Sequence, residues 1–389
     1  MLDEAVRGDL LEAPVEREQR VTALELFFDL VFVFAITQET GFLYHEPTWT
    51  RVAEAVAILM VLWFAWTAYA WLGNTAASDE GTMRVVLLAA MAPLLVASLA
   101  VPHAFGKNAL LFGVAYFLVR SLHLVEYALL ARGNPELQAA VVRLARSILP
   151  AAGFLVLAGL VPEPLRAFCW IAALAIDYGG LLLSSIEGWR VQPAHFAERH
   201  GLIIIIALGE SIVALGVGAS GLALDAGVIA AVVLGLAVAA CLWWAYFDVV
   251  AMVAERKLRE AGPVKRARIA RDSYSYLHLP MVAGIVFFAF GVKTTLVHVH
   301  AQLASVPAAA LCGGVALYLV ALSAFKRRNV GSFNYPRLVA SATLVVLVPA
   351  ATALPALVSL ALVAVVACSL IAYEVFRYAE ARERIRHAG

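Results

Sequence analysis

The chain has 389 residues, of which 63% are hydrophobic and only 15% are charged. Soluble domains average roughly 45–50% apolar and about 25% charged residues, so this composition excludes an ordinary soluble protein and favours an integral membrane protein. The formal net charge is +1, and the basic residues lie at the ends of apolar segments, which argues against nucleic acid as a partner. The four cysteines lie in apolar runs without Cys-x-x-Cys spacing. We therefore expect them to be small buried residues, with no disulfide, no metal site and no cofactor.

The apolar segments are long enough to cross a membrane as helices. A span needs about 20 apolar residues, and an apolar run of that length satisfies its backbone hydrogen bonds in lipid as a helix. The sequence predicts an all-α polytopic bundle of twelve spans, at residues 23–43, 52–72, 83–101, 108–130, 139–161, 165–186, 200–219, 226–248, 274–293, 306–325, 336–352 and 355–376. The preceding residues lack a signal-peptide pattern, so we expect the first span to stay in the mature protein.

The distribution of Lys and Arg predicts the orientation. Of the 29 basic residues, Arg120, Arg143 and Arg146 lie inside predicted spans, away from their ends. With a cytoplasmic N-terminus, and with residues at span ends counted with the adjacent loop, 22 of the others lie on the cytoplasmic side and 4 outside. Since basic residues favour cytoplasmic loops, both termini are predicted to be cytoplasmic. The segment from Glu255 to Arg271 contributes seven of them. We interpret it as a topology signal, with a lipid-headgroup or regulatory role as the alternative.

Short sequence matches recur in the same order in the two halves of the chain. They pair Trp63–Tyr69 with Leu242–Tyr246, Pro93 with Pro280, and Gly113–Val119 with Gly314–Val320. Because six is an even number, two six-span units insert with the same orientation and are related by an axis along the membrane normal. We predict a cytoplasmic segment 1–20, a first six-helix repeat 21–190, a second parallel repeat 191–378 and a cytoplasmic tail 379–389. The tryptophans of the second and eighth spans are interpreted as interfacial aromatics.

The first span carries two carboxylates, Glu25 and Asp29, which share a helix face because they are four residues apart. A charge deep in the bilayer costs on the order of 2.5–3.5 kcal/mol on insertion scales, so it is expected to face a bundle interior, a counter-ion or water. Two buried like charges suit a proton carrier or a cation site. The alternative is a structural ion pair or, for Glu25, a charge near the interface.

Glu210 lies near the middle of the seventh predicted span, and the repeat makes it the counterpart of Asp29. Each half then opens with a helix that carries a carboxylate. Gly209 and Gly216 would let other helices approach closely. The alternative is a buried glutamate held by serine or tyrosine hydroxyls.

The fourth span carries Arg120, His123 and Glu126, spaced three residues apart. Arg120 falls close to the bilayer centre, and because a guanidinium stays protonated it needs an anion there. The candidate anions are Asp29, Glu126, Asp177 and Glu210. His123 is a candidate for titration, since histidine changes charge near neutrality. The alternative is a static charge network that fixes helix packing.

The ninth span contains Pro280, which removes a backbone donor and can kink the helix. His278 lies beside this break and is a further candidate site residue, with a histidine satisfied by a neighbouring carbonyl as the alternative. Asp177 and Asp248 are weaker candidates. No nucleotide loop, His-Glu-x-x-His motif or Gly-x-Ser-x-Gly motif is found, so we expect no enzyme.

Three segments resemble the bacterial low temperature requirement protein A family: Leu24–Gln38, Glu198–Ser211 and Tyr274–Met281. The resemblance covers nearly the whole chain. It implies a multi-pass bacterial plasma-membrane protein, associated by name with growth in the cold, and it implies no molecular activity. The segment from Phe28 to Thr37 is also similar to the first pore helix of the lysosomal potassium channels. That likeness is one of fold alone, because Phe28 stands where their motif has serine.

These features favour a transporter or channel for a small ion or solute. Asp29 and Glu210 would bind a proton or cation, and Arg120 would hold an anion or act as a counter-charge. One alternative is a non-transporting scaffold or cold-stress factor with a structural charge network. Another is an intramembrane enzyme that acts on lipid through His123 or His278. The expected partners are the lipid bilayer and an unidentified small ion or solute, and a homodimer is left open.

Overall fold

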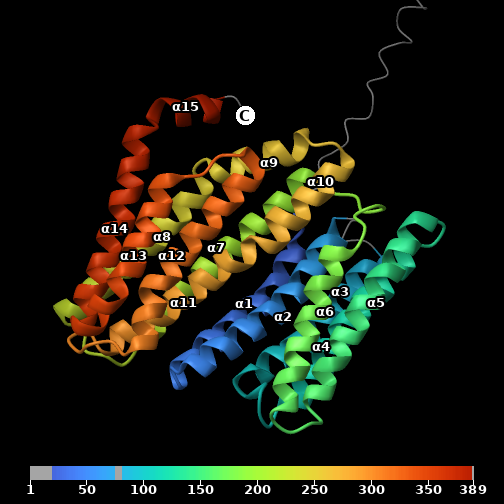
Figure 1. The fold of residues 1–389 in the computed structure, drawn as a ribbon, viewed down its shortest axis with the longest axis horizontal. Helices are drawn as coiled ribbons and strands as arrows, with labels where there is room; N and C mark the ends of the chain where they lie inside the picture. The colour runs from blue at the N-terminus through green and yellow to red at the C-terminus, as the bar shows by residue number, and fades with distance from the viewer. Residues whose placement is uncertain (1–19, 75–80, 388–389) are drawn as a thin grey trace, which may run out of the picture.

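The computed structural model describes residues 20–74 and 81–387, which fold into helices with no named strand among them (Figure 1). In chain order the elements are α1 (Ala23–His45), α2 (Trp49–Gly73), α3 (Gly81–Ala100), the short 3₁₀ helix η1 (Val101–His103), α4 (Ala109–Leu130), α5 (Pro135–Ala158), α6 (Leu165–Leu183), α7 (Pro193–Ala219), α8 (Ala226–Phe247), α9 (Val250–Glu260), α10 (Pro263–Ile269), the π-helix η2 (Ala270–Tyr276), α11 (His278–Val297), α12 (Ser305–Val330), α13 (Tyr335–Ala353), α14 (Ala356–Arg377) and α15 (Ala379–His387).

Twelve spans in the described part of the chain are long and apolar enough to cross a membrane, which confirms the predicted number. The last two predicted spans are separate helices, α13 and α14. The basic segment from Glu255 to Arg271, expected as a loop, is instead mostly helical, because α9, α10 and η2 continue the spans on either side. The predicted N-terminal segment lies, except for Arg20, outside the described residues, and most of the predicted tail forms α15.

Local sequence determines where the helices begin. The Thr22 hydroxyl accepts a hydrogen bond from the Glu25 amide, and the Glu25 carboxylate accepts one from the Thr22 amide, so a capping box starts α1. Pro193 stands in the first turn of α7, where its missing N–H costs nothing. This helix therefore begins seven residues before the predicted span at 200, and it includes a polar segment that the prediction left in a loop.

The helices form two lobes side by side, one from α1–α6 and the other from α7–α14 (Figure 1). The lobes meet where α1 and α2 pack against α7 and α11. Helices α9, α10 and α15 lie at one end of the bundle. In both halves the first helix of the predicted unit packs on the third, and the fourth packs on the third and the fifth. This shared pattern agrees with a duplication, which stays a prediction.

Two tryptophans of the second predicted span lie inside the protein and not at its surface. Trp63 and Trp66 are fully buried, whereas Trp243 and Trp244 of α8 are 44% and 37% exposed. Trp63 Nε1 donates to the Ser275 carbonyl of the other lobe at 2.7 Å. The interfacial interpretation was therefore wrong for Trp63 and Trp66, because their indole N–H groups find acceptors inside the protein.

The cysteines are free in this structure, but they are not all buried. Cys169 and Cys312 are buried, whereas Cys241 is partly exposed and Cys368 is exposed. The sulfur atoms of Cys241 on α8 and Cys368 on α14 are 3.6 Å apart. The expectation of small buried residues therefore holds for two of the four, since the outer faces of α8 and α14 need no polar surface against lipid.

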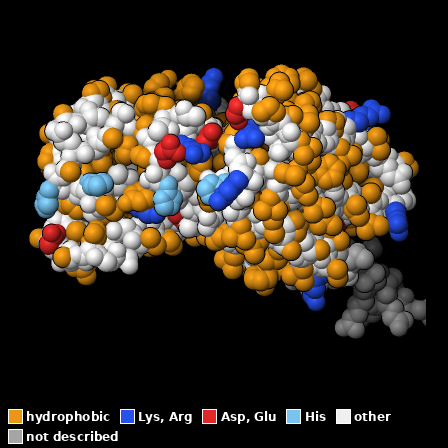
Figure 2. Space-filling model, turned by 90° about the horizontal axis from the view of Figure 1, so that it is seen from below, with side chains coloured by type: hydrophobic (Ala, Val, Ile, Leu, Met, Phe, Trp, Pro, Cys, Tyr) orange, Lys and Arg blue, Asp and Glu red, His pale blue; other side chains and the backbone are white. Residues whose placement is uncertain are grey.

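The outer surface is apolar, as contact with lipid requires. Large side chains such as Phe168 and Val346 are 61% and 75% exposed, and exposed apolar surface on this scale marks a membrane-facing protein. Figure 2 shows the end opposite α9 and α10, where charged and histidine side chains gather toward the middle of a largely apolar outline. Arg51 forms ion pairs there with Glu46 and Glu54 at 2.9 and 2.8 Å.

Candidate functional site

A buried ion pair joins the first helix of one half to the first helix of the other. Asp29 Oδ1 of α1 accepts hydrogen bonds from Arg199 Nη2 of α7 at 3.0 Å and from Trp66 Nε1 of α2 at 2.8 Å. The three side chains are at most 1% exposed. The Arg199 guanidinium also lies over the Trp66 ring, 5.7 Å from its centre, which adds a cation–π contact. The pair therefore crosses the boundary between the lobes.

Glu25 lies one turn before Asp29 and faces the same partner helix. Its carboxylate accepts a hydrogen bond from His195 Nε2 at 3.0 Å and lies 4.0 Å from Arg199 Nη1. Both acids of α1 thus meet bases on α7. We call the contact between these two helices the α1–α7 seam, and the four side chains Glu25, Asp29, His195 and Arg199 its charged cluster.

Three buried groups were not predicted from the sequence, namely His195 and Arg199 of this seam and Glu39 of α1. His195 and Arg199 were left out because the seventh span was predicted to start at residue 200. Their four-residue spacing, which matches that of Glu25 and Asp29, was a signal that could have found them. Glu39 of α1 was also missed, although it lies inside a predicted span. It is 1% exposed, and its Oε2 atom has no hydrogen-bond partner among the described residues.

Glu210 lies farther along the same seam, away from the charged cluster. It accepts a hydrogen bond from Thr37 Oγ1 of α1 at 2.5 Å, and Thr37 follows Asp29 by eight residues, or about 12 Å of helix. The buried side chains of Phe32 and Ile36 lie between the two levels. Arg199, rather than Glu210, is thus level with Asp29. The repeat made Glu210 the counterpart of Asp29, but the two carboxylates lie at different depths, because α7 begins earlier than predicted.

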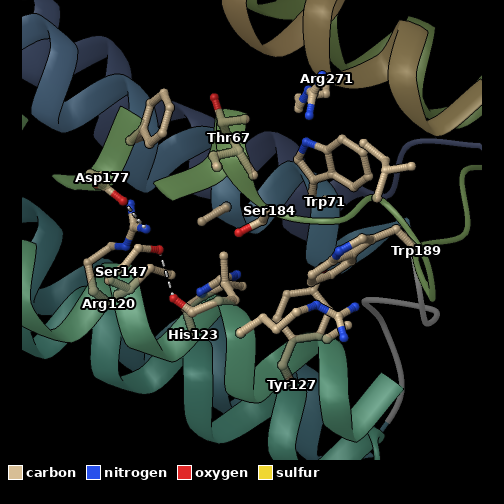
Figure 3. Close-up of a pocket in the computed structure, with 18 of the residues that line it drawn as sticks. Thr67, Trp71, Arg120, His123, Tyr127, Ser147, Asp177, Ser184, Trp189 and Arg271 are labelled. Atoms are coloured by element: carbon tan, nitrogen blue, oxygen red, sulfur yellow. Dashed lines mark hydrogen bonds and ion pairs between the residues drawn. The ribbon is translucent and has the colours of Figure 1, made fainter. Parts of the chain in front are cut away.

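The central arginine pairs with one of its four candidate anions, Asp177. Arg120 Nη2 of α4 lies 3.2 Å from Asp177 Oδ1 of α6. Tyr116 bridges the pair, since its hydroxyl accepts from Arg120 Nη1 at 3.0 Å and donates to Asp177 Oδ2 at 3.2 Å. The pair lines a cavity of about 70 Å³ between α2, α4, α5 and α6, which we call the first-half cavity (Figure 3).

The three polar residues of α4 do not form one network. Arg120 and His123 line the first-half cavity, where the His123 ring lies 5.5 Å from that of Tyr69 and 4.9 Å from that of Tyr127. Glu126 does not line the cavity. It is 2% exposed, and neither carboxylate oxygen has a hydrogen-bond partner among the described residues. Arg120 and His123 therefore stay together as candidates, and Glu126 is separate.

His278 is held on both sides in a cluster of aromatic rings from Tyr246, Tyr274 and Phe325, which we call the aromatic core. Its Nδ1–H donates to the Ser273 carbonyl at 3.2 Å, and Nε2 accepts from the Tyr246 hydroxyl at 2.8 Å. Its ring stacks on Tyr274, with 5.3 Å between centres. The π-helix η2 directly precedes it, so the chain breaks its regular helix close to Pro280, as the sequence suggested. This geometry favours a packing role for His278.

The second half has a cavity between the corresponding helices, α8, α12, α13 and α14, with a volume of about 320 Å³. A bidentate pair lines it, with Arg337 Nε and Nη2 each 2.8 Å from the Glu374 carboxylate. Asp248 pairs with Arg382 at 2.5 Å at its rim. We call this the second-half cavity. Arg337 and Glu374 were not predicted, because they lie near span ends where charges are common.

Within residues 20–74 and 81–387, no group of three or more His, Cys, Asp or Glu side chains could hold a metal ion. Several buried acids are instead paired with bases, and two of these pairs line the first-half and second-half cavities.

Comparison with known proteins places the chain in one family. The family model of the bacterial low temperature requirement A protein (LtrA) matches residues 20–372. The chain is also 31% identical over 314 residues to an uncharacterized protein of Rhizobium meliloti (strain 1021), an alignment that covers 78% of this chain and 76% of that protein. No solved structure matches the chain.

Proposed function

We propose, on the premise that this chain belongs to the bacterial low temperature requirement A protein family, that it transports a small ion or solute across the plasma membrane. A multi-pass membrane protein of a bacterial family is consistent with that location. The proposal includes the absence of enzymatic activity, and it assigns proton or cation binding to the carboxylates of the α1–α7 seam.

The observation that carries the proposal is that the charged cluster spans the two halves. Glu25 and Asp29 belong to the first half, and their partners His195 and Arg199 belong to the second. A relative movement of the halves along the seam would separate these pairs. An unpaired buried charge costs several kcal/mol, so separation favours a proton or a cation on the acid that loses its base. Movement of the halves and ion binding are thereby linked.

The arrangement of the seam also supports a transport route. One polar level contains Asp29 and Arg199, and the other contains Thr37 and Glu210, with Phe32 and Ile36 between them. Two polar levels with buried apolar side chains between them suit alternating access, because an ion would meet a partner at each level without a continuous polar path.

The competing function is a non-transporting membrane protein whose charges only fix helix packing. The double hydrogen bond to Asp29 Oδ1 favours it, since Trp66 and Arg199 together hold that oxygen in place. The transporter predicts flux of an ion or solute through reconstituted membranes, and the scaffold predicts none.

The experiment is a flux screen on the full chain reconstituted in liposomes that contain a pH-sensitive dye. Gradients of Na⁺, K⁺ and a panel of small organic acids and bases are imposed in turn, and protein-free liposomes are the control. We expect at least one gradient to move protons only when the protein is present. Absence of flux across the panel, in vesicles shown to hold folded protein, would favour the scaffold.

A further inference from the structure

We infer that the first-half cavity binds a small organic anion that carries a carboxylate. This inference rests on the proposed function, because it names the class of solute that the transporter would carry. The site lies in the first half, between α2, α4, α5 and α6, and is distinct from the charged cluster of the α1–α7 seam.

The charge of the cavity selects an anion. Its lining includes three arginines, Arg120, Arg143 and Arg271, and one acid, Asp177. Asp177 pairs with Arg120, and Arg271 pairs with Asp272 outside the lining. Arg143 forms no ion pair with any described residue, and its Nη2 atom donates only to the Glu187 carbonyl at 3.0 Å. A positive charge at a cavity is most stable with an anion beside it.

Unpaired donors around the cavity support the same choice. Arg120 Nε, Arg143 Nε and the Thr67 hydroxyl are buried and have no hydrogen-bond partner among the described residues. A buried donor without a partner costs about 1–3 kcal/mol, and here three such groups come from three helices around one cavity. A carboxylate supplies acceptors only, so it is the group that these donors fit.

The opposite side of the cavity is aromatic. Figure 3 shows Trp71, Trp189 and Tyr127 close together, across the cavity from the Arg120–Asp177 pair. The Trp189 ring lies 6.0 Å from that of Trp71 and 5.2 Å from that of Tyr127, both edge to face. This wall suits a compact apolar body attached to the carboxylate.

The size of the cavity limits the ligand to a small molecule. One water needs roughly 10–15 Å³ of such space, and the cavity has about 70 Å³. That is room for a few waters or a short organic acid, and it is too small for a nucleotide or a lipid.

The test measures ligand binding by thermal melting of the purified full chain in detergent. The probes are butyrate and benzoate, with butyramide and benzamide as neutral compounds of nearly the same shape. A ligand that binds only the folded state stabilises it by RT ln(1 + [L]/Kd), so Tm keeps rising with the logarithm of ligand concentration above the Kd. We expect both carboxylates to raise Tm in this concentration-dependent way and both amides to leave it unchanged. Equal shifts from acids and amides, or no shift from either acid, would overturn the inference.

Two variants locate the binding, and one serves as a matched control. Arg143→Gln removes the unpaired charge at a partly exposed position, and Thr67→Val removes a hydroxyl at nearly constant shape. Each is expected to weaken the apparent Kd for benzoate about tenfold, the effect of losing a hydrogen bond to a charged group. Lys326→Gln removes an unpaired positive charge from the second-half cavity and should leave the Kd unchanged. An equal loss in Lys326→Gln would place the anion elsewhere and refute the site.

Failure of this inference and failure of the proposed function give different results. Asp29→Asn should bind benzoate as the unaltered chain does, because Asp29 does not line the cavity. Flux of a cation without any carboxylate binding would leave the proposed function standing and remove the inference. Carboxylate binding with no flux of any solute would leave the binding site standing and remove the proposed function.

Discussion

Asp29 accepts hydrogen bonds through Oδ1 alone, from Trp66 and Arg199, and its Oδ2 atom has no partner among the described residues. The guanidinium of Arg199 is likewise only partly used, since Nε and Nη1 form no hydrogen bond. At the scale of single residues the pair is therefore held by charge and by one short contact, and both side chains keep polar atoms that have no hydrogen-bond partner among the described residues. Such a pair is stable when closed, and it has atoms available for a proton, water or ion when it opens.

This geometry predicts strong coupling between the two side chains. Arg199→Gln leaves Asp29 as a buried, uncompensated charge and should lower stability by about 3–5 kcal/mol. Asp29→Asn leaves Arg199 with Glu25 and should cost less. The double variant should be more stable than the sum of the two changes implies, by at least about 1 kcal/mol. Denaturant unfolding of the purified variants measures the cycle, and additive losses would contradict a direct pair.

At the scale of elements, close helix contacts depend on glycine. A Cβ atom added at Gly314 of α12 would lie 2.6 Å from the Gly284 carbonyl oxygen of α11 and 2.6 Å from the Phe288 amide nitrogen. One added at the adjacent Gly313 would meet nothing within 4 Å. The α11–α12 pair carries the π-helix and His278 on one side, so its spacing also positions the aromatic core.

The two neighbouring glycines give a matched prediction. Gly314→Ala should force the backbones apart and lower the Tm of the purified protein by several degrees, with reduced membrane yield, because overpacking costs about 1–3 kcal/mol. Gly313→Ala should leave Tm unchanged or raise it slightly, since alanine favours a helix over glycine. Thermal melting of the two variants side by side is the measurement. A larger loss from Gly313→Ala would mean that α11 and α12 do not pack in this register.

The elements were predictable from sequence to different degrees. Length and apolarity found all twelve spans, because each must cross the bilayer alone. The acids Glu25, Asp29 and Glu210 were found because a charge in an apolar run is conspicuous. Their partners were not, since His195 and Arg199 lie in a polar stretch that only Pro193 shows to be helical.

Groupings that depend on packing were out of reach of the sequence. Nothing in a linear pattern says that Arg120 meets Asp177 rather than Asp29, or that four helices leave a space beside that pair. The same holds for Trp63 and Trp66, whose burial depends on acceptors from other helices.

At the scale of the whole molecule, the predicted orientation assigns each end of the bundle to one side of the membrane. Helices α9, α10 and α15 lie at one end, and the basic residues of α9 and α10 make it the expected cytoplasmic end. A fluorescent protein that is active only in the cytoplasm should be active when it is fused after residue 383. A phosphatase that is active only in the periplasm should be inactive at the same position. Fusions after residue 162, between α5 and α6, should give the opposite result. Phosphatase activity at both positions would reject an even number of spans with cytoplasmic termini.

The central claim is that the α1–α7 seam couples ion binding to transport, and proton flux in proteoliposomes tests it most directly. The comparison is Asp29→Asn on the seam against Glu374→Gln, which neutralises a buried, arginine-paired acid away from the seam. Both variants remove a buried charge pair, so each controls for the stability loss of the other. Under the gradient that drives the unaltered chain, Asp29→Asn should lose proton movement and Glu374→Gln should retain it. Proton movement by Asp29→Asn at the rate of the unaltered chain would contradict the account.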